Sequence, residues 1–332
     1  IIYIRSINMN KLKKVGLTAL AGSLVATSAM ADMSVSGSSS IGLTSISETY
    51  PDSAATALSN TSGNGFTMGN SVTFSASGEM DNGMTVSTSF ELDQGAENGG
   101  GPFDSHSISI DMNEMGKLTF SGHGGSTAVG KYDDMTPNAY EEVWDVLDNN
   151  GAAADDGGGN DMWQYSNTFA DSISVFASYY NQESGVVESY SDFGVTYTGV
   201  EGLTIGYAEG ENKQTSAAFD EQETMFITYA YGPLTVGYQT SESDVQGGVT
   251  SDADTLAYSA SYAVSDDLSV SYGVHEYEYG NTSLVDQESS GFSVSYTMGS
   301  MTFGGAINST DNVAGNSGND EEGYEVSVSF AF

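Results

Sequence analysis

Apolar and polar residues alternate one by one along many short segments of the chain. Residues 84–92, 203–207 and 268–274 place an apolar residue at nearly every second position, with Ser, Thr, Gly or an acidic residue between them. Successive side chains of a β-strand point to opposite faces, so each segment predicts a strand with one apolar face. After residue 31 the sequence has no run of 18 or more apolar residues, which excludes membrane-spanning helices. The pattern indicates an all-β protein.

The connections between the predicted strands alternate between short and long. The short ones contain Gly, Asn, Asp or Pro, which favour tight turns, and lie near residues 81–83, 113–116, 170–171, 199–202, 232–233, 265–267 and 299–300. The long ones are polar and acidic and lie near residues 47–65, 94–104, 125–160, 182–188, 211–221, 243–251, 281–287 and 310–320. Seven short and eight long connections join sixteen strands. Short turns at one end and long loops at the other predict a 16-stranded antiparallel transmembrane β-barrel.

The last predicted strand has one wholly apolar face. Its apolar positions are Tyr324, Val326, Val328, Phe330 and Phe332, with Glu, Ser or Ala between them. In a closed barrel the last strand pairs with the first, so no strand edge is left exposed. We therefore expect these five side chains to face lipid and the last strand to lie in the barrel wall.

The N-terminal residues predict export. A lysine-rich start, a short stretch of apolar and small residues, and the small-x-small pattern Ala29-Met30-Ala31 make residues 9–31 typical of a Sec signal peptide. We interpret residues 1–8 as upstream translated sequence without a role in the working protein. Residues 32–332 then form the barrel, and their length requires no second domain.

The exported chain is predicted to be strongly acidic. After residue 31 three lysines and no arginine stand against 45 acidic residues, which gives a net charge of −42. Such a chain repels nucleic acid and attracts cations. Disordered acidic chains lack aromatic residues, whereas this one has 20 Tyr and 14 Phe. It contains no cysteine, so disulfide bonds do not stabilise it.

Together, the signal peptide, the sixteen amphipathic strands and the final aromatic strand ending in Phe332 resemble the general porin family of Gram-negative bacteria. The resemblance covers residues 32–332. It implies an outer-membrane diffusion channel, a homotrimer in contact with lipid and lipopolysaccharide, and a last strand recognised by the barrel-assembly machinery. It also implies that the third long loop folds inward and narrows the pore.

The third long loop supplies the candidate constriction residues. Loops this long inside a compact domain are usually functional or disordered. Pro137 is followed by Tyr140, Val143, Trp144 and Leu147, a helix-like spacing that predicts a short helix packed against the inner wall. The acidic residues expected at the lumen are Asp133, Asp134, Glu141, Glu142, Asp145 and Asp148.

This chain departs from the best-known porin pattern, in which arginines face the acidic loop across the pore, because no arginine follows residue 31. Lys117 and Lys131 could lie near the constriction but cannot build such a cluster. Carboxylates at a narrow, partly desolvated point favour cations over anions, so we expect a cation-selective pore. The alternative is that the loop carboxylates are simply solvated.

Other functions have weaker support. Residues 148–161 mix acidic residues and glycines as calcium loops do, but they do not match the spacing of a calcium-binding motif, so we expect no cofactor and keep Ca²⁺ as an alternative. A secreted or surface adhesin, or a calcium-binding structural protein, would also use alternating strands. An enzyme is not expected, because the only histidines that could pair with Asp or Ser in a hydrolase site are His106, His123 and His275, and no G-x-S-x-G motif is present.

Overall fold

The computed structural model describes residues 32–49, 63–93, 103–145, 147, 151, 153–154, 160–181, 189–212, 221–245 and 252–332. Within these ranges the chain forms sixteen strands and three short 3₁₀ turns. The strands are β1 (Asp32–Thr49), β2 (Gly63–Glu79), β3 (Thr85–Asp93), β4 (Ser105–Asp111), β5 (Lys117–His123), β6 (Met162–Phe169), β7 (Ile173–Tyr180), β8 (Tyr190–Val200), β9 (Leu203–Asn212), β10 (Glu221–Tyr231), β11 (Leu234–Asp244), β12 (Ala253–Ala263), β13 (Leu268–Tyr279), β14 (Gln287–Met298), β15 (Met301–Asp311) and β16 (Asp320–Ala331). The 3₁₀ turns are η2 (Asn113–Met115), η3 (Val129–Lys131) and η4 (Val313–Gly315).

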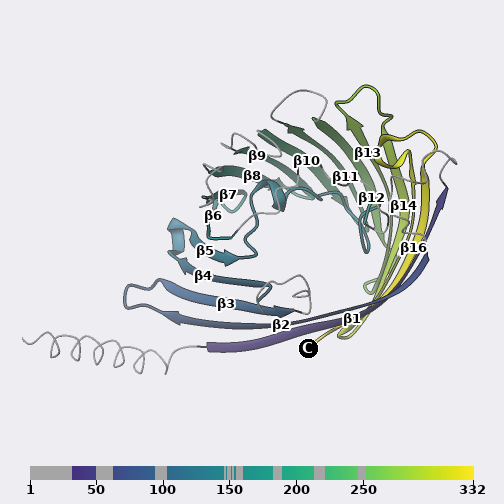
Figure 1. Ribbon diagram of the computed structural model, residues 1–332. Helices are drawn as coiled ribbons and strands as arrows, with labels where there is room; N and C mark the ends of the chain where they lie inside the picture. The colour runs from purple at the N-terminus through teal and green to yellow at the C-terminus, as the bar shows by residue number, and fades with distance from the viewer. Residues whose placement is uncertain are drawn as a thin grey trace, which may run out of the picture.

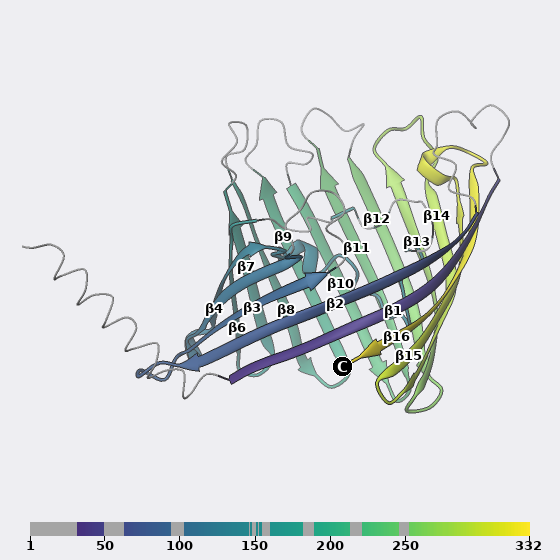
Figure 2. The same cartoon turned by 60° about the horizontal axis from the view of Figure 1, so that its bottom comes forward.

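The strands close into one barrel. Each strand pairs with its neighbours in the sequence, and β1 also pairs with β16, from Ser38 opposite Ala331 to Thr49 opposite Asp320. All pairings are antiparallel, and the strands form a ring in which β1 lies beside β16 (Figure 1). Seen from the side, β1 and β2 run obliquely across the wall (Figure 2). The predicted 16-stranded barrel is confirmed.

Short turns occupy one end of the barrel and longer connections the other. The short turns need backbone conformations that favour glycine, such as Gly83 with a φ of 81° and Gly202 with a φ of 75°. At Gly202 a Cβ atom would also strike the carbonyl oxygen of Ala230. The third long connection leaves β5 and enters β6 at the end opposite to these turns.

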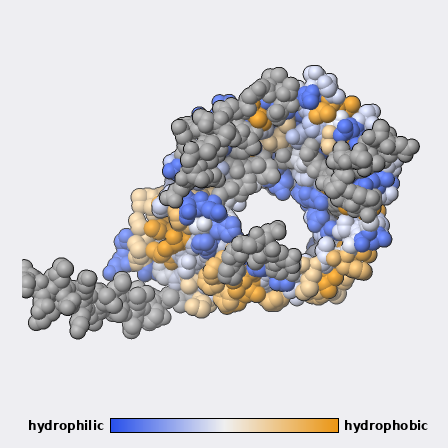
Figure 3. Space-filling view, viewed as in Figure 1, coloured by the Kyte–Doolittle hydropathy of each residue, from blue (hydrophilic) through white to orange (hydrophobic). Residues whose placement is uncertain are grey.

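Alternating side chains divide the wall into two faces. In β10, Met225, Ile227 and Tyr229 are 48%, 41% and 44% exposed, whereas Thr224 and Phe226, on the opposite face of the strand, are each 1% exposed. Phe226 packs inside the barrel against the third loop, so the exposed set faces outward. A channel passes through the molecule, with hydrophilic residues around it and hydrophobic residues on the outer wall (Figure 3). In the described part of the chain, no helix is long and apolar enough to cross a membrane.

The last strand follows the same rule. Tyr324, Val326 and Phe330 are 43%, 53% and 40% exposed on the outer face, and Phe332 is 72% exposed. Val328 lies on the same outward face of the strand and is partly exposed. Glu325, on the other face, points inward and contacts the third loop. The predicted apolar outer face of the last strand is therefore confirmed.

Candidate constriction site

The third loop enters the barrel and follows its inner wall. It begins after β5, forms the η3 turn, and then contacts successive inward-facing side chains from β8 round to β16. Most of these contacts join a polar side chain of the wall to a backbone group of the loop. The loop is therefore fixed by the barrel, and its path confirms the expected inward fold.

Asp192 of β8 holds the start of the loop. Its Oδ2 atom accepts hydrogen bonds from the N–H groups of Ala128 and Val129, the second at 3.0 Å, and from the Tyr190 hydroxyl at 3.3 Å. Its Oδ1 atom accepts from the Ser178 N–H at 2.9 Å and from the Ser178 hydroxyl at 2.5 Å. The side chain is only 7% exposed. A carboxylate with this many donors positions the η3 turn firmly against β7 and β8.

Gln239 of β11 fixes the next stretch. Its Nε2 atom donates to the carbonyl oxygens of Tyr132 and Asp133 at 2.5 and 3.0 Å, and its Oε1 atom accepts from the Met135 N–H at 2.7 Å. The Tyr132 hydroxyl also lies 2.6 Å from the Thr196 hydroxyl. Backbone groups on both sides of Asp133 and Asp134 are thus tied to the wall.

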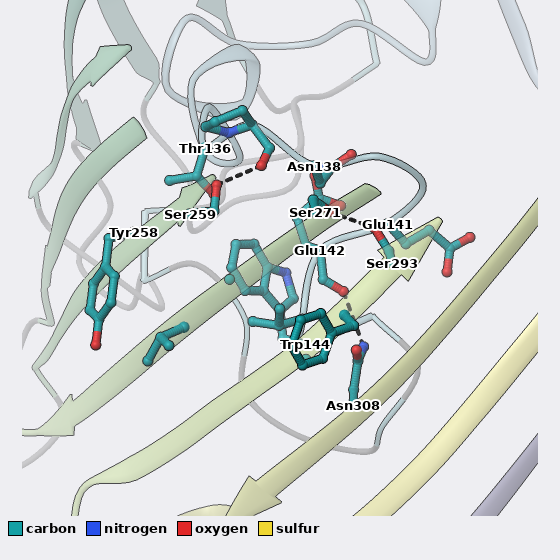
Figure 4. A pocket seen from close by; sticks show the side chains of 16 residues that line it. Thr136, Asn138, Glu141, Glu142, Trp144, Tyr258, Ser259, Ser271, Ser293 and Asn308 are labelled. Atoms are coloured by element: carbon teal, nitrogen blue, oxygen red, sulfur yellow. Dashed lines mark hydrogen bonds between the residues drawn. The ribbon is translucent and has the colours of Figure 1, made fainter. Parts of the chain in front are cut away.

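Serine hydroxyls hold the middle of the loop. Ser259 donates to the carbonyl oxygen of Pro137 at 2.6 Å. The N–H group of Ala139 donates to Ser271 at 2.9 Å, and that of Tyr140 donates to Ser293 at 3.2 Å. Figure 4 shows the labelled serines beneath this part of the loop.

Inward glycines make room for the side chains of the loop. A Cβ atom at Gly194 would lie 2.8 Å from the Tyr132 ring, and one at Gly273 would lie 3.1 Å from Val143. A Cβ atom at Gly237 would strike Pro137, and one at Gly304 would strike the Tyr140 ring. Strand glycines at such positions allow another chain segment to approach closely.

The loop then reaches the closure between β16 and β1. The Tyr140 hydroxyl donates to Glu325 Oε1 at 2.5 Å, while Thr44 of β1 donates to Glu325 Oε2 at 2.9 Å. Asn308 of β15 donates to the carbonyl oxygen of Glu142 at 3.3 Å. Glu325 therefore joins β1, β16 and the loop.

The short helix predicted from residue 137 onward is wrong. None of residues 137–145 is helical, and the 3₁₀ turn of this loop lies earlier, at Val129–Lys131. The carbonyl oxygen of Pro137 accepts from Ser259 of the wall, and the N–H group of Glu142 donates to the Asp145 side chain instead of to the carbonyl of Asn138, which explains the failure. The apolar side chains do pack as expected: Val143 and Leu147 are 8% and 6% exposed, and Leu147 packs with Ala306, Ile46 and Tyr140.

The acidic candidates lie on this wall-bound segment. Asp133 is half-buried, Asp134 and Asp145 are exposed, and Glu141 and Glu142 are partly buried. Asp148 lies outside the described residues. Glu142 accepts a hydrogen bond from the Asn138 side chain, and its N–H group donates to Asp145 at 3.3 Å. The structure thus places five of the six candidates on one inward segment of the loop.

Two of these carboxyl groups ionise at higher pH than usual. Burial raises the pKa of Glu141 to about 7, and the nearby charge of Glu325 adds to this shift. Burial also raises the pKa of Glu142 to about 8, with a further contribution from its contact with Asp145. Burial and the hydrogen bond to Glu325 raise the pKa of Tyr140, so its hydroxyl stays protonated and donates.

Comparison with known proteins identifies the family. The family model for the Gram-negative porins matches residues 16–289. The chain belongs to the Gram-negative porin family. It is thus an outer-membrane channel protein, and this match together with the closed barrel does not favour a secreted adhesin. A search of curated protein sequences found no match.

Solved porin structures share the fold of this porin. The anion-selective porin from Comamonas acidovorans superposes with a TM-score of 0.65 at 12% identity, covering 91% of this chain and 100% of that one. A mutant of the Rhodopseudomonas blastica porin gives a TM-score of 0.64 at 12% identity with the same coverage. At such low identity the likeness shows the barrel and not the selectivity.

The histidines of the porin do not form a catalytic arrangement. His275 is 1% exposed, and its ring centroid lies 4.4 Å from that of Trp144 on the loop. His123 Nδ1 lies 2.5 Å from Asn160 Oδ1, and the His106 ring lies 6.1 Å from that of Phe103. Over the described ranges, no histidine is hydrogen-bonded to a serine or a carboxylate, and no group of three or more His, Asp or Glu residues could hold a metal ion.

Sequence reasoning did not identify the residues that hold the loop. Asp192, Gln239 and Glu325 occupy inward positions of strands, where polar residues are expected in any porin. The one available signal was the position of Asp192, an acidic residue on the inward face of its strand with aromatic residues nearby. The alternation of a strand shows which side chains point inward, but it does not reveal which of them the loop contacts.

Proposed function

We propose that this porin forms a water-filled channel for passive diffusion of ions and small hydrophilic solutes, and that the channel prefers cations. The observation that carries the preference is the acidic segment inside the barrel. Its five described carboxyl groups belong to a stretch of loop that Gln239, Ser271 and Asn308 bind to the inner wall. Carboxylates held at a narrow point lower the energy of cations and raise that of anions.

Little positive charge opposes these carboxylates. After residue 31 the sequence contains three lysines, no arginine and 45 acidic residues. The field inside the pore is therefore expected to be negative at neutral pH. The anion selectivity named for the Comamonas porin is a property of that protein, and the shared fold is compatible with either sign.

Planar-bilayer recording tests the channel and its selectivity together. The refolded protein is placed between KCl solutions of different concentration, and the single-channel conductance and reversal potential are measured. Stable conductance steps with a reversal potential near the potassium limit are expected. A reversal potential on the chloride side would contradict the cation preference and leave the channel intact.

Matched variants locate the charges responsible. At pH 9, where Glu141 and Glu142 are ionised, the quadruple variant D133N/D134N/E141Q/E142Q removes four carboxylates from the loop and should move the reversal potential toward zero. The control E221Q/E223Q/E242Q/D254N removes four carboxylates that face outward on β10, β11 and β12. It should leave the reversal potential nearly unchanged, because charges on the outer face are farther from the pore and screened by salt. Equal shifts would show that total charge, and not the loop, sets the selectivity.

The outer wall is divided into two sectors by its charges. In β1 to β8 every Asp and Glu occupies an inward position of the alternation. In β9 to β16 the carboxylates mostly face outward at the long-loop end. The outward ones are Glu209, Glu211, Glu221, Glu223, Glu242, Asp244, Asp254, Glu276, Glu278, Glu288, Asp311, Asp320 and Glu322. Many are direct cross-strand neighbours, such as Glu223 and Glu242.

We propose that the sector β1 to β8 contacts the other subunits of a homotrimer. This sector offers large exposed apolar side chains without an outward carboxylate in its strands, including Phe66 at 84%, Met68 at 60% and Trp163 at 48% exposure. Exposed apolar patches of this kind are typical of interaction surfaces. The acidic sector β9 to β16 is costly to bury against protein, so we place it against the polar headgroups of lipid and lipopolysaccharide.

Paired substitutions test the subunit contact. Phe66→Asp should reduce the fraction of protein that migrates as an oligomer in unheated gels and in native mass spectrometry. Phe292→Asp is the control, because Phe292 is 65% exposed in the acidic sector. Loss of the oligomer in both variants, or in neither, would contradict the assigned interface.

We further propose that residues 9–31 direct export through the Sec pathway and that the barrel-assembly machinery recognises the outward face of β16. The outward position of Tyr324, Val326, Phe330 and Phe332 supports this recognition.

The proposed channel needs no cofactor. The Ca²⁺ alternative concerns residues 148–161, most of which lie outside the described residues, and isothermal titration with CaCl₂ tests it.

A further inference from the structure

A recess of about 320 Å³ lies inside the barrel, beside the start of the third loop. The strands β4, β5, β6 and β7 form its floor, and the loop closes one side. Two lysines line it together with side chains that are mostly neutral and polar. Its volume is at the lower end of that of small-molecule sites.

The charge of this recess is opposite to that of the whole chain. Lys117 and Lys131 both line it, and no Asp or Glu is among its lining residues. Over the part of the chain that the structure describes, these two lysines are the only Lys or Arg residues. Two lysines therefore line one concave place that no Asp or Glu lines, within a chain that carries 45 acidic residues.

Each lysine is positioned by an ordered element. Lys131 ends the η3 turn, whose first N–H groups are held by Asp192, and its Nζ atom lies 4.7 Å from the centroid of the Phe176 ring. Lys117 is the first residue of β5, and its side chain lies on the same inward face of the strand as those of Thr119 and Ser121. The cross-strand neighbour of Lys117 is Asp111, whose Oδ1 atom accepts the Asn113 N–H at 2.8 Å.

The remaining polar side chains are neutral and mostly carry hydroxyl groups. Gln164 is held in place, because its Nε2 atom donates to the Ser126 carbonyl at 2.7 Å and its Oε1 atom accepts from Ser121 at 3.0 Å. Hydroxyls of Thr119 and Ser166 are then available as donors around the two ammonium groups. Charged N–H donors combined with hydroxyl donors suit an anion whose charge lies on oxygen.

We propose that this recess binds one small oxyanionic group, a carboxylate or a phosphate, of a solute that enters the pore. The proposal rests on the proposed channel function, because the solute reaches the recess through the lumen. Asp111 lies opposite Lys117 but does not line the recess, and charges farther than a Debye length of about 8 Å are largely screened at physiological salt. The ammonium group of lysine is a compact point charge that can bind either a carboxylate or a phosphate.

Current blockade by anions tests the recess. Single-channel potassium current is recorded in KCl while potassium succinate, or in a second series potassium phosphate, is added at constant potassium activity. A saturable fall in current is expected with at least one of the two anions, and the anion that gives it identifies the oxyanion class. Open channels with no saturable fall for either anion would overturn the proposal. Absence of any conductance would instead count against the channel function itself.

Matched lysine variants separate the recess from general charge. Lys117→Met and Lys131→Met should each raise the anion concentration for half-maximal blockade about tenfold or more, which corresponds to losing one ionic contact. Lys213→Met removes the same charge at the residue that follows β9 in the sequence, and should leave blockade unchanged. Lys117→Arg and Lys131→Arg keep the charge and should therefore retain most of the anion blockade that the Met variants lose. Equal weakening in Lys213→Met would overturn the assignment.

Discussion

Gly37 of β1 and Phe332 exchange two backbone hydrogen bonds, with N···O distances of 2.7 and 2.9 Å. The Phe332 ring lies over Gly37 on the outer face, so that a Cβ atom at residue 37 would lie 2.7 Å from a ring carbon. The last residue of the chain is thus paired with the first strand. This contact extends the closure between β1 and β16 to the end of the sequence.

Gly37→Val should weaken this closure. The added side chain would meet the Phe332 ring and also the carbonyl oxygen of Ser71, 2.9 Å from the Cβ position, at a cost of about 1–3 kcal/mol. The temperature at which the barrel loses its compact migration in SDS gels should therefore fall. Gly78→Val in β2 is the control, because a Cβ atom at Gly78 meets nothing within 4 Å. Equal changes in both variants would contradict the role of the contact.

Phe332→Ser should reduce assembly of the barrel in cells. It removes a 72% exposed ring from the outward face of the last strand while leaving the backbone pairing with Gly37 possible. The amount of heat-modifiable protein in outer-membrane fractions measures the effect. Phe303→Ser changes another outward ring, 43% exposed on β15, and should have a smaller effect. If both variants assemble equally well, recognition does not depend on the terminal ring.

Asp192→Ala should release the start of the third loop. The buried N–H groups of Ala128, Val129 and Ser178 would lose their acceptor, at about 1–3 kcal/mol for each group left without a partner. We expect noisier single-channel currents and faster proteolysis of the loop. Glu79→Ala, which removes an inward carboxylate near the short turns, controls for charge. Quiet currents like those of the unmodified protein would show that other contacts suffice.

Gly304→Val should lower the single-channel conductance. The new side chain would occupy the space of the Tyr140 ring and displace that part of the loop from the wall toward the lumen. Gly305→Val is a matched control one residue away, because a Cβ atom there meets its nearest neighbour at 3.4 Å. An unchanged conductance in Gly304→Val, with the barrel intact by heat modifiability, would contradict the predicted displacement.

Cation preference should increase between pH 6 and pH 9. The pKa of Glu141 is raised to about 7 and that of Glu142 to about 8, so both carboxyl groups are mostly neutral at pH 6 and ionised at pH 9. Raising the pH therefore adds negative charge to the loop, and the reversal potential should move toward the potassium limit. The variant E141Q/E142Q should lose most of this dependence. A pH dependence that persists in this variant would assign it to other groups.

Much of the barrel could be predicted from local patterns. Period-2 alternation at residues 203–207 and 268–274 predicted strands that the structure contains, because side-chain direction in a strand depends only on position along it. The short turns could be placed from Gly and Asp, which provide unusual backbone angles at little cost. The apolar residues at every second position from Tyr324 to Phe332 likewise indicated the outward face of the last strand.

The course of the third loop could not be predicted in this way. Helix-like spacing after Pro137 suggested a helix, but Ser259 of the wall binds the Pro137 carbonyl and the Asp145 side chain binds the Glu142 N–H, both of which a helix would use. Asp192 and Gly304 are far from this loop in the sequence, and only barrel closure brings them to it.

The sequence by itself determined the strand number, the faces of the strands and the acidic charge, because these depend on residue type and on neighbours along the chain. The tertiary structure alone decided where the loop lies, that Glu325 joins β1, β16 and Tyr140, and that Lys117 and Lys131 share one recess. Such contacts depend on distances across the closed barrel. No local pattern encodes these distances, because they are set only when β1 pairs with β16.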